Sequence, residues 1–255
     1  HHQPDRQGIS QATKVGSTPV EQYRNEFASQ LRDSAALKHK LLETQGDVMA
    51  RIAVAVIDAF RNGHRVYFCG NGGSFTDAHH IVGELVGRYG YDRPPLPAFV
   101  LGAGVATMTA IANDYGYDQV FSREAKAVCE TGDVLIGLST SGNSRNVCDA
   151  MAAAQEKGAF TIGWAGEKTA RIDEVSDIVL HVPSSHTPRI QECHITAGHV
   201  VCDLVEKALF PKGAQNLTAD AKTAKNCLKV NYHSVTPRRH GAPRAASEPD
   251  CGQAI

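Results

Sequence analysis

Long apolar runs are missing from this sequence: none approaches the roughly 18 to 20 residues that a membrane-spanning helix needs. The polar N-terminus also lacks the apolar core of a signal peptide, which favours a cytoplasmic location. Neither sign of charge dominates, because 26 basic and 27 acidic residues are spread along the chain and give a formal net charge of -1. This balance provides no electrostatic footprint for nucleic acid or a membrane surface, and it favours a small-molecule partner.

The cysteines also lack the number and spacing that are typical of a disulfide framework. The seven cysteines are odd in number, and most of them lie within apolar helical or strand patterns, so we expect buried free thiols. Cys193 lies close to candidate site residues and could be mildly reactive. The sequence has no internal repeat and no glycine fingerprint for a dinucleotide cofactor.

The 255 residues, 42% of them hydrophobic, suffice for one large domain or two small ones. Residues 1–18 are polar and aperiodic, and residues 212–255 lack hydrophobic periodicity. We therefore predict that the first segment is disordered and that the second is disordered or accessory. Residues 19–211 carry the patterns of the folded domain.

Two helices are predicted before the first strand, over residues 19–45 and 47–61. Thr18, Pro19 and Glu21 supply an N-cap, a proline at the first helical position and an acidic N3 residue, which together form a strong helix start. Apolar side chains recur at helical spacing in both segments: Tyr23, Phe27, Leu31, Leu37 and Leu41, then Val48, Ile52, Val56 and Phe60. These stripes can cover a sheet or pair with a neighbouring subunit.

Short apolar segments alternate with helical patterns in the rest of the domain. The predicted strands are residues 65–68, 98–101, 133–138, 160–164 and 177–182. Such alternation predicts an α/β fold in which helices cover both faces of a parallel sheet. Ligands of such sheets bind beyond the carboxyl ends of the strands.

The first motif, CGNGGSFTDAHHIVGELVGR at residues 69–88, reads as strand end, glycine turn and helix. Its turn, Asn71 to Ser74 with Gly72 and Gly73 between them, leaves unpaired N–H groups at the helix start, where an anion is favoured. His80 and Glu84 are four residues apart and share one helix face. They could hold a divalent metal or divide acid and base work, and an exposed ion pair on a capped helix is equally consistent with them.

The second motif is the hydroxyl turn, Ser139-Thr140-Ser141-Gly142-Asn143-Ser144, which follows the third predicted strand and precedes a helix. Hydroxyl and N–H donors at a helix start form a phosphate cradle that needs no basic residue. One serine would suffice as a helix cap, so the surplus of hydroxyls favours the phosphate site.

Other polar positions have more than one interpretation. The helix predicted over 187–209 carries Gln191 and His199 two turns apart, with Glu192 and His194 between them, and these could line a cleft or serve as surface and core residues. Residues 114–118 form a turn whose carboxylates and tyrosines could contact a sugar. A helix cap by Asp118 is the favoured alternative.

Together, the segments CGNGGSFTDAHHIVGELVGRY, LSTSGNSRNV and RIQECHITAGH resemble the phosphoheptose isomerases of the sugar isomerase domain superfamily. The resemblance covers about residues 19–211, in the family's order and spacing. It implies a flavodoxin-like five-stranded parallel sheet, a homotetramer, and conversion of D-sedoheptulose 7-phosphate into D-glycero-D-manno-heptose 7-phosphate.

The resemblance also implies roles for single residues. The positions that match a zinc site are His80, Glu84, Gln191 and His199, and those that match the acid/base catalysts are Glu84 and His199. The positions that match phosphate contacts are Ser139, Thr140, Ser141 and Ser144. Further substrate contacts are expected from Asn71, Gly72, Gly73, Ser74, Arg88, Asn113, Asp114 and Gln191.

Two departures and one alternative accompany the resemblance. Family members commonly carry an aspartate where this chain has Pro188, and a smaller or polar residue where it has Phe75. The alternative is a domain of the same superfamily that binds a phosphosugar or a protein without catalysis. Such proteins usually lack the metal and acid/base set, whereas this chain has all four candidates, which favours the enzyme.

Overall fold

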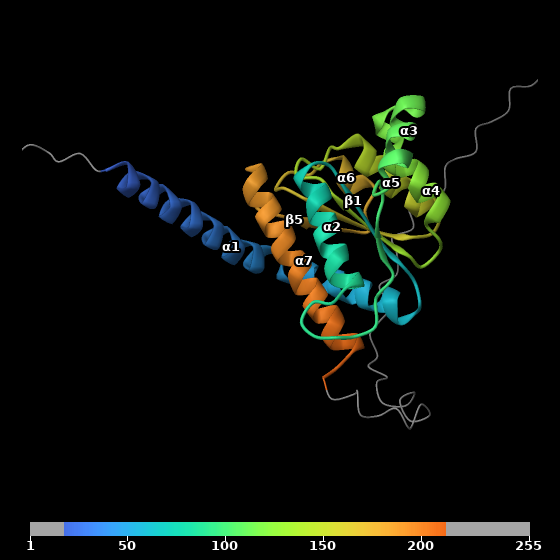
Figure 1. Ribbon diagram of the computed structural model, residues 1–255, viewed down its shortest axis with the longest axis horizontal. Coiled ribbons are helices and arrows are strands. Elements are labelled where there is room, and N and C mark those ends of the chain that lie inside the picture. Colours follow the sequence, from blue (N-terminus) through green and yellow to red (C-terminus); the bar gives the residue numbers. More distant parts are fainter. Residues whose placement is uncertain (1–17, 213–255) are drawn as a thin grey trace, which may run out of the picture.

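A computed structural model describes residues 18–212 as a five-stranded parallel sheet between two layers of helices (Figure 1). The strands are β1 (Val66–Gly70), β2 (Ala98–Val100), β3 (Val134–Leu138), β4 (Phe160–Ala165) and β5 (Ile178–His181). Their order in the sheet is β2-β1-β3-β4-β5, and every pairing is parallel. The predicted flavodoxin-like sheet is therefore confirmed.

Alternate side chains of the central strand β1 enter different cores. Val66 and Phe68 of β1 belong to a core with α1 (Pro19–Arg61), α2 (Gly73–Val86) and α7 (Thr187–Leu209). Tyr67 and Cys69 point to the opposite face, where the core includes α4 (Val120–Val128) and α5 (Arg145–Glu156). Both faces are buried, which explains why the strands read as continuous apolar runs. The remaining helices are α3 (Val105–Tyr115), the 3-10 helix η1 (Tyr117–Gln119) and the short α6 (Arg171–Glu174).

The prediction of two N-terminal helices is wrong, because α1 is one continuous helix of 43 residues. Its start is as expected, with Thr18 and Glu21 forming a capping box around Pro19. Gly46 lies in the middle of the helix. A glycine costs only about 1 kcal/mol relative to alanine, which is small beside the burial of Ile52, Val56 and Phe60 against the sheet.

The first half of α1 extends away from the sheet (Figure 1). Its apolar stripe is exposed, with relative accessibilities of 75% for Val20, 70% for Tyr23, 72% for Phe27 and 66% for Leu31. The stripe becomes buried at Leu41, where the helix reaches the core. The stripe from Val20 to Leu31 is therefore left uncovered by residues 18–212 of a single copy.

The carboxyl ends of β1 and β3 form the point where the strand order reverses. The chain leaves β1 through α2 toward β2 on one side, and β3, β4 and β5 follow on the other side. The glycine turn follows β1 and the hydroxyl turn follows β3, and Gly70 pairs with Leu138 in the sheet. Both motifs are thus placed side by side at the ligand-binding edge of this fold.

Two smaller points concern the predicted segments. Asp118 is not a helix cap: it lies within η1 and forms an ion pair with Arg145 at 3.2 Å, while Gln119 precedes α4 without a side-chain cap. The predictions for 1–17 and 213–255 lie outside the described residues. No helix between residues 18 and 212 is long and apolar enough to span a membrane.

Candidate active site

Helices α2 and α7 lie side by side and run in the same direction, which brings their polar faces together (Figure 1). Close contacts recur along the pair. Gly73 contacts Gln191 at one end, and about two turns further along both helices Ile81 packs on Gly198. A Cβ on Gly73 would lie 2.5 Å from Gln191 Nε2, so this position leaves room only for glycine unless the amide moves.

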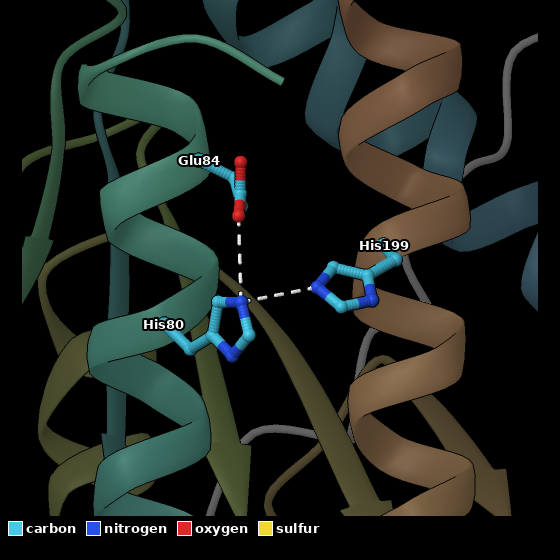
Figure 2. Close-up of side chains that lie close together, drawn as sticks. All are labelled: His80, Glu84 and His199. Carbon is cyan, nitrogen blue, oxygen red and sulfur yellow. Dashed lines mark hydrogen bonds and ion pairs between the residues drawn. The ribbon is translucent and has the colours of Figure 1, made fainter. Parts of the chain in front are cut away.

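His80, Glu84 and His199 converge between the two helices (Figure 2). His80 Nε2 lies 3.3 Å from Glu84 Oε1 and 3.2 Å from His199 Nε2. One potential ligand atom from each residue lies within 4.8 Å of the others. The His80 side chain is 50% exposed and that of Glu84 25% exposed, so the cluster is open to solvent and to a ligand.

This triad has the composition and spacing of a metal site. Zinc binds histidine nitrogen and carboxylate oxygen at about 2.0–2.2 Å, which separates neighbouring ligands in a tetrahedron by roughly 3.3 Å. The two measured distances from His80 Nε2 are of this size. The three side chains therefore fit a divalent ion with an open position for a fourth ligand. The interpretation of His80 and Glu84 as an isolated surface ion pair does not account for His199.

Hydroxyl groups cluster in the second turn. Ser139 is buried, and its Oγ donates to Ser144 Oγ at 2.9 Å and accepts from the Ser144 N–H at 3.3 Å. Ser141 is exposed, and its Oγ accepts from the Asn143 N–H at 3.2 Å. Ser144 is the N-cap of α5 but makes no side-chain capping bond. The hydroxyls therefore organise the turn instead of capping the helix.

An amide pair joins the two turns. Asn71 Nδ2 donates to Asn146 Oδ1 at 2.8 Å, and Asn146 Nδ2 donates back to Asn71 Oδ1 at 2.9 Å. Tyr117 adds a third bond from its hydroxyl to Asn71 Oδ1 at 2.9 Å. The sequence analysis missed Asn146 and the contact of Tyr117, since both depend on β1 and β3 being neighbours.

Other predicted contact residues surround these turns with fewer recorded interactions. Ser74 is buried at the start of α2, and Thr140 is half-buried. Arg88 is exposed beyond the end of α2. Asn113 and Asp114 are exposed at the end of α3, where Asn113 Nδ2 donates to Asp114 Oδ1 at 2.8 Å.

The residues between Gln191 and His199 do not line a cleft. His194 is fully buried, and burial lowers its pKa to about 4, so the ring is neutral. Glu192 accepts from Ser34 at 2.7 Å and pairs with Arg189, which fixes α7 to α1. Cys193 is 1% exposed, and burial raises the pKa of its thiol, so the expectation of reactivity is wrong.

Asp77 is a further polar residue that the sequence analysis missed. It lies on α2 one turn before His80, and its Oδ2 is buried with no hydrogen-bond partner among residues 18–212. Burial raises the pKa of this carboxyl, and His80 partly offsets the shift by lowering it. An unsatisfied carboxylate oxygen beside the triad is consistent with a cationic or protonated neighbour at this site.

A buried ion pair holds the end of α2. Arg93 and Glu206 are each 1% exposed in their side chains, with Arg93 Nε 3.2 Å from Glu206 Oε2. Arg93 also donates to the carbonyl oxygens of Glu84 at 2.8 Å and Leu85 at 2.6 Å. The backbone that carries Glu84 is therefore tied to α7 through this pair.

Comparison with known proteins agrees with this architecture. The family model of the SIS domain matches residues 30–166. A phosphoheptose isomerase from Pelobacter propionicus is 45% identical over 186 residues, which cover 73% of this chain and 98% of that protein. The structure of a phosphoheptose isomerase from Francisella tularensis is similar, with a TM-score of 0.69 and 31% identity over 75% of this chain and 100% of that one. For a phosphoheptose isomerase from Neisseria gonorrhoeae, the TM-score is 0.67 and the identity 34%, with 72% and 99% covered. The chain therefore belongs to the SIS domain family and, within it, to the phosphoheptose isomerases.

Proposed function

We propose that this protein converts D-sedoheptulose 7-phosphate into D-glycero-D-manno-heptose 7-phosphate, as an aldose–ketose isomerase of nucleotide-heptose biosynthesis. The observation that carries the proposal is the convergence of His80, Glu84 and His199 between α2 and α7, which pack on one face of the sheet. Family membership supports the substrate. A binding domain without catalysis would have no use for an acid/base pair in this arrangement.

The reaction requires one proton to leave C1 of the ketose and one to arrive at C2. Glu84 is the proposed base for the carbon proton, because its carboxylate is three-quarters shielded from solvent and faces the space between the helices (Figure 2). His199 is the proposed carrier of protons between the hydroxyl and carbonyl oxygens, since an imidazole can donate and accept near neutral pH. No hydride cofactor is needed.

Zinc is the proposed metal, held by His80, Glu84, His199 and the amide oxygen of Gln191. The nitrogen and carboxylate donors and their spacing suit this ion. When bound, zinc would supply positive charge that stabilises a developing oxyanion. Glu84 would then serve both as a ligand of the metal and as the base for the proton at C1. Zinc titration of His80→Ala should show less than one ion per subunit, and unchanged content would reject the assignment.

The hydroxyl turn is the proposed phosphate site, with Ser139, Thr140, Ser141 and Ser144 as its side-chain donors. Its position at the N-terminus of α5, a helix of 12 residues, supports this role. Asn71, Gly72, Gly73, Ser74, Arg88, Asn113 and Asp114 are the proposed contacts to the rest of the sugar. Replacing both Ser141 and Ser144 by alanine should weaken binding of the phosphorylated sugar, and an unchanged Kd would count against the site.

A homotetramer in the cytoplasm is the proposed state of the protein, with domain limits near residues 19 and 211. The exposed stripe of Tyr23, Phe27 and Leu31 supports self-association, because a second copy could cover it. Light scattering should report four subunits for the wild type and fewer for Phe27→Asp with Leu31→Asp. A wild-type monomer at assay concentration would contradict this state.

The deciding experiment incubates the zinc-loaded protein with sedoheptulose 7-phosphate and follows aldose formation by NMR. Loss of general acid/base help costs about 10² to 10⁴ in rate, so Glu84→Gln and His199→Ala should each lose at least that factor. His79→Ala is the matched control, because this neighbouring ring contacts the Phe75 carbonyl oxygen instead. Near-normal turnover by Glu84→Gln would exclude it as the base. In deuterated water the aldose should carry deuterium at C2, and its complete absence would indicate a hydride shift.

A further inference from the structure

The segment between β4 and β5 is hydrogen-bonded to the backbone of the hydroxyl turn. The N–H of Gly166 donates to the Thr140 carbonyl oxygen at 3.1 Å, and the N–H of Ile172 donates to the Gly142 carbonyl oxygen at 2.9 Å. These two bonds come from opposite ends of the segment 166–174. The backbone of the turn therefore takes its position from this segment.

The hydroxyl turn also packs closely against residues 170–172. Gly142 has φ +68°, and a Cβ there would lie 2.6 Å from Ala170 Cβ and 3.2 Å from Ile172 Cγ2. Asn143 also accepts, through Oδ1, from the Arg171 N–H at 3.2 Å. No space remains between the turn and the start of α6, so a displacement of α6 would displace the turn.

One side chain holds both ends of this segment. His181, the last residue of β5, places Nδ1 2.7 Å from the Gly166 carbonyl oxygen and Nε2 2.8 Å from Asp173 Oδ1. Asp173 in turn accepts from the Ala170 N–H through Oδ2 at 2.8 Å. The imidazole ring thus links Gly166 and Asp173, near the two ends of the segment that contacts the hydroxyl turn.

Both partners of the ring are hydrogen-bond acceptors. A neutral imidazole has one N–H and can satisfy only one of them, whereas the imidazolium donates to both. The charged group that contacts the ring is Asp173 of α6. From α1, the neutral Gln45 contacts the backbone of His181, accepting from its N–H at 3.3 Å.

We propose that His181 is a positioning residue for phosphate binding, which acts through Gly166 and Asp173 on the backbone of the hydroxyl turn. Its recorded contacts are with Gln45, Gly166 and Asp173, and not with the triad. This inference rests on the proposed role of the turn as the phosphate site. Its effect should therefore fall on substrate affinity and leave proton transfer largely intact.

The experiment compares His181→Ala, His181→Arg and Glu174→Gln. Loss of the paired bonds should raise KM for sedoheptulose 7-phosphate about tenfold with little change in kcat. Arginine keeps several donors and its charge at every accessible pH, so His181→Arg should recover most of the affinity. Glu174→Gln is the matched control, since it removes an exposed carboxylate next to Asp173 on the same helix.

Hydrogen exchange gives a readout that does not depend on turnover. Peptides covering 139–144 and 166–174 should exchange faster in His181→Ala than in Glu174→Gln, while peptides of α7 stay unchanged. Absence of turnover in the wild type would reject the proposed function but not this result. Equal KM and equal exchange in the two variants, or a loss confined to kcat, would overturn the inference. Asp173→Asn, which preserves side-chain size, tests the same contact if His181→Ala folds poorly.

Discussion

Replacing Glu206 by alanine should destabilise the protein more than any change on its exposed surface. The carboxylate is 1% exposed and accepts from the backbone N–H groups of Tyr89 at 2.9 Å, Gly90 at 2.7 Å and Tyr91 at 3.1 Å, besides its ion pair with Arg93. Alanine removes the acceptor of the three N–H groups and leaves the buried Arg93 without its carboxylate partner. The guanidinium of Arg93 is the most serious loss, because a buried charge without a partner is strongly unfavourable.

The expected cost follows from this burial. Removing one partner of a buried ion pair costs about 3–5 kcal/mol, which is a large part of the roughly 5–15 kcal/mol that stabilise a typical domain. The orphaned N–H groups act in the same direction, although the terms do not simply add. Activity should fall as well, since Arg93 also holds the carbonyl oxygen of Glu84.

Urea denaturation at one fixed protein concentration measures the effect. With m-values of about 1–3 kcal/mol/M, the midpoint of Glu206→Ala should fall by at least about 1 M. Asp203→Ala is the matched control, because this carboxylate lies one turn earlier on α7 and pairs with the exposed Lys207. If the two variants lose the same stability, the argument from burial is wrong.

The loss of stability caused by Glu206→Ala should also depend on pH. Burial alone would raise the pKa of Glu206, but its three backbone donors and Arg93 lower it below the ordinary value of 4.5. A carboxyl whose pKa is lowered by folding contributes stability above its unfolded pKa, and this contribution is lost as pH falls through the folded pKa. The difference between wild type and Glu206→Ala should therefore be full at pH 7 and shrink below about pH 4.5.

Three further outcomes are expected. Gly73→Ala should push the Gln191 amide aside, so zinc affinity should fall about tenfold or more while the melting temperature stays nearly constant; unchanged zinc affinity would show that the amide position is irrelevant. Cys193 should resist thiol reagents in the native state and react after unfolding, as mass spectrometry of its peptide can test. Burial lowers the pKa of His194 to about 4, so unfolding takes up a proton between roughly pH 6.5 and 4, and stability falls as pH falls through that window. His194→Phe should make urea midpoints at pH 7 and pH 5 more alike, and an undiminished difference would argue against a buried neutral ring.

Local patterns predicted most of the fold. The five strands are short apolar runs between glycine-rich turns, and each was placed within about two residues of its observed bounds. The last helix, Thr187–Leu209, was predicted with its observed ends, and Pro211 follows its end, where a proline commonly stops a helix. The break expected near Gly46 failed because packing of the flanking helix outweighs the preference of one glycine.

The site was predictable only in part. Helical spacing places His80 and Glu84 on one face, but periodicity cannot give the register between α2 and α7 that brings His199 within 3.2 Å of His80. The pairing of Arg93 with Glu206, 113 positions apart, is equally invisible to local patterns. Family resemblance predicted that His199 joins His80 and Glu84, whereas nothing in the sequence predicted the pairing of Arg93 with Glu206.

The two halves of the site come from opposite faces of the sheet. The triad stands on α2 and α7, which pack on one face, whereas the hydroxyl turn opens α5 on the other. Each half is fixed within its own helix layer, so their separation depends on what crosses the edge between β1 and β3. The reciprocal amide bonds of Asn71 and Asn146 make that crossing directly, and Tyr117 restrains the same oxygen. If the phosphosugar binds both the turn and the triad, as proposed above, their separation must be constant, and we infer that this amide pair contributes to it.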